Sequence, residues 1–281
     1  MATNDQLKEL VRQKYSSIAL QDKTVNQSSC CGAGACSTDV VNIMTDDYSG
    51  IEGYNPDADL GLGCGLPTTF AGIKEGDTVI DLGSGAGNDC FIARNEAGES
   101  GTVIGIDFTE AMIEKARENA TKLGYSNVTF RLGDIEHLPV PDNVADVIVS
   151  NCVLNLVPNK PAVFAEMFRA LKPGGHFSIS DVVLIGNLPD ALKQDAEMYA
   201  GCVAGAITKD EYLRGIAESG FTDVTVQREK KIVIPDDILQ KYAADPSMKD
   251  FGSNDHGIVS ITVYGVKPKA AAACCAPGCC D

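Results

Sequence analysis

Cysteine is the residue type with the most chemical potential in this chain of 281 residues, which contains eleven of them. Three lie in a Gly-, Ala- and Ser-rich N-terminal stretch, four lie in an Ala-rich tail, and four stand alone. In that order they are Cys30, Cys31 and Cys36; Cys274, Cys275, Cys279 and Cys280; and Cys64, Cys90, Cys152 and Cys202. Because thiols stay reduced in the cytoplasm, clustered cysteines there indicate metal, metalloid or redox chemistry rather than a disulfide framework.

Three of the isolated cysteines occupy positions where a sulfur would face a ligand. Cys64 lies in the glycine-rich run 61–65, Cys152 follows a predicted strand at 145–151, and Cys202 lies beyond the last predicted parallel strand. Thiolates select soft, thiophilic centres. Structural zinc usually has four ligands from Cys pairs or histidines, and the three histidines of this chain fit no such pattern. Three thiolates suit trivalent arsenic, which binds three sulfurs and keeps a lone pair. The fourth isolated cysteine, at position 90, is predicted to be a packed helix residue.

A glycine loop at 83–87, reading G-x-G-x-G, forms the second group of chemically informative residues. Glycines at a strand-to-helix turn let the backbone approach a ligand closely. The spacing differs from the G-x-G-x-x-G of dinucleotide sites. The flanking Asp81 and Asp89 would oppose a pyrophosphate but suit a positively charged cofactor. Asp107, at the end of the next predicted strand, is placed to accept hydrogen bonds from the hydroxyls of a ribose.

Alternating strands and helices must position these residues. Short β-branched runs predict strands at 78–82, 102–107, 128–133, 145–151 and 176–181. Helical spacing and capping residues predict helices at 4–18, between Thr109 and Gly124, and from about 159 to the turn at 171–175. Further along the chain, residues 188–245 are predicted to be mostly helical, with a strand near 223–234. Residues 257–266 are predicted to form a late strand. Strands that alternate with helices imply crossover units and a parallel sheet.

The loop, Asp107, the run 134–136 and the turn 171–175 resemble the class I S-adenosylmethionine methyltransferases over about residues 70–185. The resemblance implies an α/β fold with a Rossmann-like core, a mostly parallel, doubly wound sheet, and S-adenosylmethionine as cofactor. By this resemblance, the methionine part and sulfonium of the cofactor would be surrounded by Asp81, Gly83, Ser84, Gly85, Gly87 and Asn88. The ribose would be held by Asp107, with Phe108 and Met112 packed near it. The adenine would be framed by Ile135 and Glu136. Asn151 either lines the cofactor pocket or only closes its strand.

A more specific resemblance spans about residues 36–206. The runs 54–56, 61–67, 81–90, 150–156 and 201–202 resemble those of arsenite methyltransferases. This implies that Cys64, Cys152 and Cys202 bind As(III), presented as arsenite or its thiol conjugate, in a detoxification reaction. The arsenic lone pair would attack the methyl carbon directly, without a general base.

The same resemblance implies thiol–disulfide exchange by an N-terminal cysteine, because methylation oxidises arsenic and a thiol must reduce it again. Cys36 is favoured by its distance from Cys64, while Cys30 and Cys31 stay open as alternatives. The oxidised cysteines would be reset by glutathione or a thioredoxin-type dithiol.

The chain is expected to divide into four segments. These are an N-terminal helix and Cys-bearing arm at 1–69, the cofactor-binding core at 70–187, an α+β substrate-binding segment completing the sheet at 188–268, and a Cys-rich tail at 269–281. The tail cysteines either capture or deliver the metalloid loosely or have no catalytic part.

Composition limits the partners. A formal net charge of −16 repels phosphate backbones and anionic lipid, so we expect neither nucleic acid nor a membrane as a partner. The longest apolar runs are well short of the roughly 20 residues needed to cross a bilayer. The charged N-terminus does not read as a secretory signal, which predicts a cytoplasmic location.

Two other functions are compatible with the same residues. The first is a class I methyltransferase acting on a quinone, a sterol or another small molecule. The second is a protein that sequesters a metalloid on its clustered cysteines and uses the sheet only as a scaffold.

Overall fold

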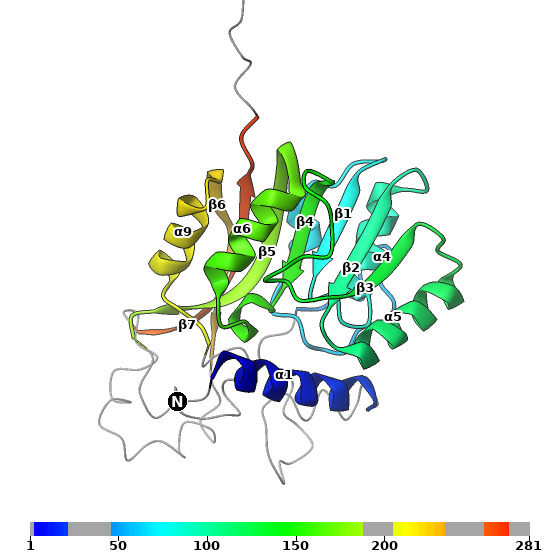
Figure 1. Cartoon of the computed structure of the whole chain (residues 1–281), viewed down its shortest axis with the longest axis horizontal. Helices are drawn as coiled ribbons and strands as arrows, with labels where there is room; N and C mark the ends of the chain where they lie inside the picture. The colour runs from blue at the N-terminus through cyan, green and yellow to red at the C-terminus, as the bar shows by residue number, and fades with distance from the viewer. Residues whose placement is uncertain (1–2, 22–45, 188–204, 234–255, 270–281) are drawn as a thin grey trace, which may run out of the picture.

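The structure is a computed structural model that describes residues 3–21, 46–187, 205–233 and 256–269 (Figure 1). Within these ranges the chain forms a seven-stranded sheet in the order β3-β2-β1-β4-β5-β7-β6. The strands are β1 (Thr78–Leu82), β2 (Thr102–Asp107), β3 (Val128–Leu132), β4 (Ala145–Asn151), β5 (Leu171–Ile185), β6 (Thr222–Ile232) and β7 (Gly257–Val266). Cys202, the three N-terminal cysteines and the four tail cysteines lie outside the described residues.

The sheet is mostly parallel, as predicted. Strands β3, β2, β1, β4 and β5 run parallel, whereas β7 pairs antiparallel with both β5 and β6. The strand order reverses between β1 and β4, and in open α/β sheets ligands bind in the crevice at such a point, outside the carboxyl ends of the strands. The topology therefore directs attention to the residues that follow β1, β2 and β4.

The helices begin and end at capping residues that the sequence displays. They are α1 (Asn4–Ala19), α3 (Pro67–Ala71), α4 (Asn88–Ala97), α5 (Glu110–Leu123), α6 (Lys160–Ala170) and α9 (Lys209–Glu218), with a 3₁₀ turn η1 at Leu154–Leu156. Thr3 with Gln6, and Thr208 with Glu211, form capping boxes at the starts of α1 and α9. Gly124 ends α5 in the left-handed conformation, as predicted.

Two hydrophobic cores cover the two faces of the sheet. Successive residues of β1 point to opposite faces, so Val79 packs with α4 and α5 while Ile80 packs with α6 and α9. Phe91 of α4 and Phe164 of α6 are fully buried in the respective cores. This burial on both faces explains why the parallel strands read as nearly continuous apolar runs.

The start of β5 differs from the prediction. Residues 171–175 were expected to form a turn before a strand starting at His176, but β5 begins at Leu171. Leu171 pairs with Ala145, and the register then shifts before His176 pairs with Val147. Gly174, with φ of 86°, supplies the left-handed residue at this irregularity. The Pro-Gly-Gly sequence therefore makes a bulge within the strand rather than a separate turn.

None of the helices among the described residues is both long enough and apolar enough to span a bilayer.

Candidate functional site

A cavity lies at the point where the strand order reverses. Its lining includes the glycine loop after β1, Asp107 at the end of β2, and Asn151 and Cys152 at the end of β4. Helix α1 contributes Lys8 and Tyr15 to the same lining. Residues distant in sequence therefore meet where the topology predicts a ligand.

Carboxylates from three elements surround the cavity. Burial raises the pKa of Asp89, in the first turn of α4, to about 6. Burial and the adjacent charge of Asp89 raise the pKa of Asp81, on β1, well above its ordinary range. Burial also raises the pKa of Asp107, although the N–H groups of Thr109 and Gly85 donate to it at 2.8 and 3.0 Å. The cavity thus gathers three buried carboxyl groups whose charged forms are disfavoured until a positive charge lies beside them.

This arrangement fits a cofactor that carries positive charge. The donors to Asp89 in the described part of the chain are neutral groups, the hydroxyl of Tyr48 and the amide of Asn151. Buried carboxylates that repel one another gain from a cationic neighbour. The hydroxyl of Ser84 is buried at the cavity and has no hydrogen-bond partner among the residues that the structure describes, so it is available to a polar ligand group. Both features suit the sulfonium and amino acid part of S-adenosylmethionine.

All of the predicted cofactor-binding residues except Gly87 and Glu136 line this cavity. Gly87 caps the start of α4 with φ of 99°, and a side chain there would collide with the ring of Phe91. Glu136 accepts hydrogen bonds from the ammonium of Lys8 and from the N–H of Asn159 at 2.9 Å. The contacts of the individual residues with the cofactor stay predictions.

Helix α1 forms a wall of the site that the sequence did not reveal. Lys8 lies 2.6 Å from Asp134 and also pairs with Glu136, so the helix is tied to the loop after β3. Lys115 of α5 donates to the carbonyl of Ala19 at 3.0 Å, near the other end of α1. The amphipathic pattern predicted the helix but carried no signal for the acidic loop that it contacts.

Beside the cavity lies a cluster of two cysteines and one aspartate. The Sγ atoms of Cys64 and Cys152 and a carboxylate oxygen of Asp181 all lie within 4.8 Å of one another, and the three residues are buried. The structure therefore brings together two of the three cysteines predicted to bind As(III). The third, Cys202, lies outside the described residues.

The loop that carries Cys64 is held by close contacts. Asn151 accepts a hydrogen bond from the N–H of Cys64 at 3.0 Å, and Ser260 of β7 donates to the carbonyl of Cys64. A Cβ atom at Gly63 would lie 2.8 Å from the Asn151 amide, and one at Gly65 would lie 2.5 Å from the Ser180 hydroxyl. The glycines are thus needed because the loop is pressed onto β4 and β5.

Cys152 has an unusual backbone. Its φ is 61°, in the left-handed region, whereas the other non-glycine residues with positive φ in the described ranges are Asn143 and Asp223. Asn and Asp visit this region more readily than other L-residues. A cysteine there is strained, and such strain tends to accumulate at functional sites.

Asp181 was not predicted as a site residue. Burial raises its pKa to about 7, although the charge of Lys160 opposes that shift. Its carboxylate accepts hydrogen bonds from the amide of Asn155 at 2.9 Å and the hydroxyl of Tyr212 at 3.2 Å. The sequence did carry a signal for Asp181, because this residue lies in β5, next to β4, and β4 ends at Asn151, directly before Cys152.

Cys90 behaves as predicted for a packed helix residue. It is fully buried in the core formed by α4 and α5. Its thiol also donates to Asp81 at 3.3 Å, and burial, followed by the charge of Asp81, raises the pKa of the thiol. Cys90 therefore remains a thiol beneath the cavity and is not a member of the Cys64 cluster.

Comparison with known proteins agrees with this geometry. A family model described as a methyltransferase domain matches residues 73–220, more than half of the chain. An arsenite methyltransferase from Halobacterium salinarum is 40% identical over 283 residues, covering 94% of this chain and 67% of the relative. Another from Aquipseudomonas alcaligenes is 33% identical over 244 residues, covering 84% of this chain and 68% of the relative.

A solved structure of an arsenic methyltransferase also resembles this chain. The crystal structure of an arsenic(III) S-adenosylmethionine methyltransferase from Chlamydomonas reinhardtii matches with a TM-score of 0.63 and 36% sequence identity. The match covers 73% of this chain and 68% of that one. The Rossmann-like fold expected from the sequence is therefore confirmed.

Proposed function

The chain belongs to the family of arsenite methyltransferases, and we propose that it methylates arsenite while Cys64, Cys152 and Cys202 hold the arsenic. The observation that carries this proposal is the meeting of the Cys64 and Cys152 sulfurs beside the cofactor cavity. Asp181 is a hard oxygen ligand, and arsenic prefers sulfur. The third ligand is therefore expected to be a thiolate rather than Asp181, and the resemblance to arsenite methyltransferases assigns it to Cys202.

Arsenic binding at this cluster is an exchange of hydroxide for sulfur. Each arsenic–sulfur bond forms as a thiol proton and an arsenic hydroxide leave together as one water molecule. Three such exchanges convert arsenous acid into a tris-thiolate and release three waters. Because Cys64 and Cys152 are both buried, this exchange also removes the arsenic from solvent.

S-adenosylmethionine, when bound, supplies a methyl group activated by its positively charged sulfur. Asp81 and Asp89 provide the negative charge that favours such a cation in the cavity. Cys64 and Cys152 hold the arsenic with its lone pair available, so no side chain has to remove a proton. Correct orientation of two reactants can lower a barrier by roughly 7 to 11 kcal/mol, which makes positioning the main task of these residues.

The product must be reduced before a further round. Methylation raises arsenic from the trivalent to the pentavalent state, and two thiolates return two electrons to it as they form a disulfide. We assign one of these thiols to Cys36, with Cys30 and Cys31 as alternatives, and the reset of the disulfide to glutathione or a thioredoxin-type dithiol. That reductant supply is consistent with the cytoplasmic location expected from the sequence.

The test is methyl transfer by the purified full-length protein. Arsenite, glutathione and S-adenosylmethionine labelled in its methyl group are incubated together, and the arsenic species are separated by chromatography. We expect label in mono- and dimethylated arsenic. If the label never reaches arsenic while the protein still binds it, the chain sequesters the metalloid and the proposal is wrong.

Variants assign the ligands. Cys64→Ser and Cys152→Ser are each expected to weaken arsenite binding by at least tenfold and to abolish labelled product. Cys90→Ser is the matched control, since it replaces a buried thiol that is not in the cluster. It should bind arsenite as tightly as the unmodified protein, and equal losses in all three variants would contradict the assignment.

A further inference from the structure

Two side chains hold the backbone of Cys64, and they come from different parts of the sheet. The side-chain oxygen of Asn151, at the end of β4, accepts the Cys64 N–H at 3.0 Å. The hydroxyl of Ser260, on β7, donates to the Cys64 carbonyl. Asn151 lines the cofactor cavity, whereas Ser260 is not part of its lining.

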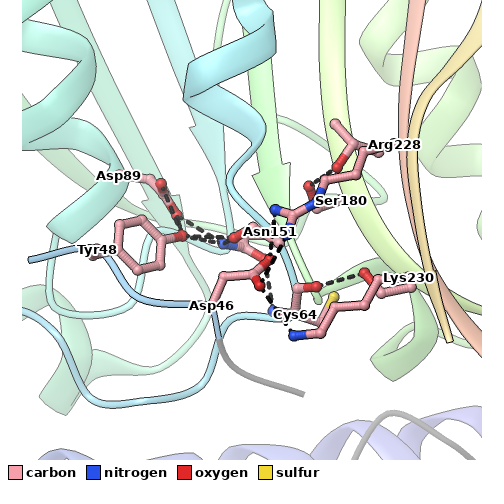
Figure 2. A network of polar contacts seen from close by, with 11 residues as sticks. Asp46, Tyr48, Cys64, Asp89, Asn151, Ser180, Arg228 and Lys230 are labelled. Atoms are coloured by element: carbon pink, nitrogen blue, oxygen red, sulfur yellow. Dashed lines mark hydrogen bonds and ion pairs between the residues drawn. The ribbon is translucent and has the colours of Figure 1, made fainter. Parts of the chain in front are cut away.

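The amide nitrogen of Asn151 faces the cofactor side. It donates to the carbonyl of Gly65 at 2.9 Å and to the carboxylate of Asp89 at 3.2 Å, and it also contacts the hydroxyl of Tyr48. Figure 2 shows Asn151 between the Tyr48–Asp89 pair on one side and Cys64 on the other. One planar side chain thus contacts a cavity carboxylate through its nitrogen and a proposed arsenic ligand through its oxygen.

Tyr48 reinforces this bridge. Its hydroxyl lies 3.0 Å from the Gly65 carbonyl and 3.1 Å from the Asp89 carboxylate, and its side chain is buried. The chain just before it is fixed by Asp46, which pairs with Arg228 and Lys230 of β6, both at 3.0 Å (Figure 2). The network therefore has little freedom to rearrange without moving the Cys64 loop.

We propose that Asn151 is a positioning residue that couples cofactor binding to arsenic binding. A cation in the cavity fixes the charged Asp89, which orients the Asn151 amide, and the amide oxygen then holds Cys64 in place for arsenic. Because coupling of two binding sites is reciprocal, arsenic must strengthen cofactor binding by the same factor. The inference rests on the proposed function for the identity of the two ligands.

Isothermal titration of the full-length protein measures this coupling directly. Sinefungin, an unreactive analogue with an ammonium group in place of the sulfonium, is titrated with and without saturating arsenite. We expect about tenfold tighter binding of sinefungin when arsenite is present, within the usual range for coupled sites. The reverse titration should give the same factor.

Three variants separate coupling from structure. Asn151→Ala should reduce the coupling factor, which is the ratio of sinefungin affinities with and without arsenite, to within twofold of one. Tyr48→Phe, which keeps the buried ring and removes only the hydroxyl, should reduce it partly and serves if Asn151→Ala does not fold. Ser260→Ala is the matched control, because it removes the hydrogen bond to the Cys64 carbonyl and leaves the Asn151 contact in place. Arsenite binding should weaken in this variant, while the coupling factor should stay unchanged.

The outcomes are distinct. Provided that arsenite still binds, any of three results would overturn the inference. These are a coupling factor of one in the unmodified protein, an unchanged coupling factor in Asn151→Ala, and a coupling factor reduced as much in Ser260→Ala as in Asn151→Ala. Failure of the unmodified protein to bind arsenite at all would instead overturn the proposed function.

Discussion

Replacing the strained Cys152 separates the stability of the fold from its function. The residue has φ of 61°, a conformation that costs an L-residue about 1 kcal/mol relative to glycine. Cys152→Ala keeps the Cβ atom and the strain, whereas Cys152→Gly removes both. We therefore expect the glycine variant to be about 1 kcal/mol more stable than the alanine variant, even though glycine carries more entropy in the unfolded chain.

Urea unfolding followed by circular dichroism measures this difference. In a chain of this size, about 1 kcal/mol corresponds to a shift of about 2 °C in melting temperature, which gives a second readout. Asn143→Gly serves as the control, since Asn143 also has positive φ, at 54°, but is a residue type that tolerates it. Its gain should be smaller than the difference between the two Cys152 variants.

Activity should not follow this difference in stability. Neither Cys152 variant has a thiol to hold arsenic, so both should lose arsenite methylation, including the one that relieves the strain. That result would mean that the cysteine is kept for its sulfur at a cost in stability. An alanine variant as stable as the glycine variant would refute the strain argument, and an active glycine variant would refute the assignment of Cys152.

Other predictions follow from the buried charges and the close loop contacts. Sinefungin binding should weaken as the pH falls below about 6, because protonation of Asp89 removes a negative charge from the cavity; constant affinity between pH 8 and pH 5 by calorimetry would contradict this. The folded-state pKa of Asp181, about 7, exceeds its ordinary value of 3.8, so its ionisation opposes folding, and stability falls as the pH rises from about 4 to about 7. Asp181→Asn should therefore raise the urea midpoint more at pH 8 than at pH 5. Gly65→Ala, whose Cβ would lie 2.5 Å from the Ser180 hydroxyl, should weaken arsenite binding about tenfold, whereas Gly50→Ala, with no atom within 4 Å, should not.

The parallel strands and most helix ends were predictable because they depend on local signals. The short β-branched, apolar runs of β1 and β2, and the capping of α5 by Gly124, are properties of a few neighbouring residues. The start of β5 at Leu171 was missed because a Pro-Gly-Gly run favours a turn, whereas pairing with Ala145 turned it into a bulge. Tertiary pairing overrode the local preference there.

The site was predictable only in part. The resemblance, not the spacing, suggested that Cys64 and Cys152 meet, and the cluster in the structure agrees with it. The Asn151 bridge to Tyr48 and Asp89 could not be read from the sequence, because its members come from separate segments and have no shared motif. Its existence depends on the packing of the Cys64 loop against β4.

X-ray absorption at the arsenic edge tests the central claim most directly. The full-length protein loaded with one equivalent of arsenite should show three sulfur neighbours around arsenic. That number should fall in Cys64→Ser, Cys152→Ser and Cys202→Ser, with oxygen replacing sulfur, and stay at three in Cys90→Ser. An unchanged three-sulfur shell in Cys64→Ser and Cys152→Ser would contradict the account, because arsenic would then be held elsewhere on the chain.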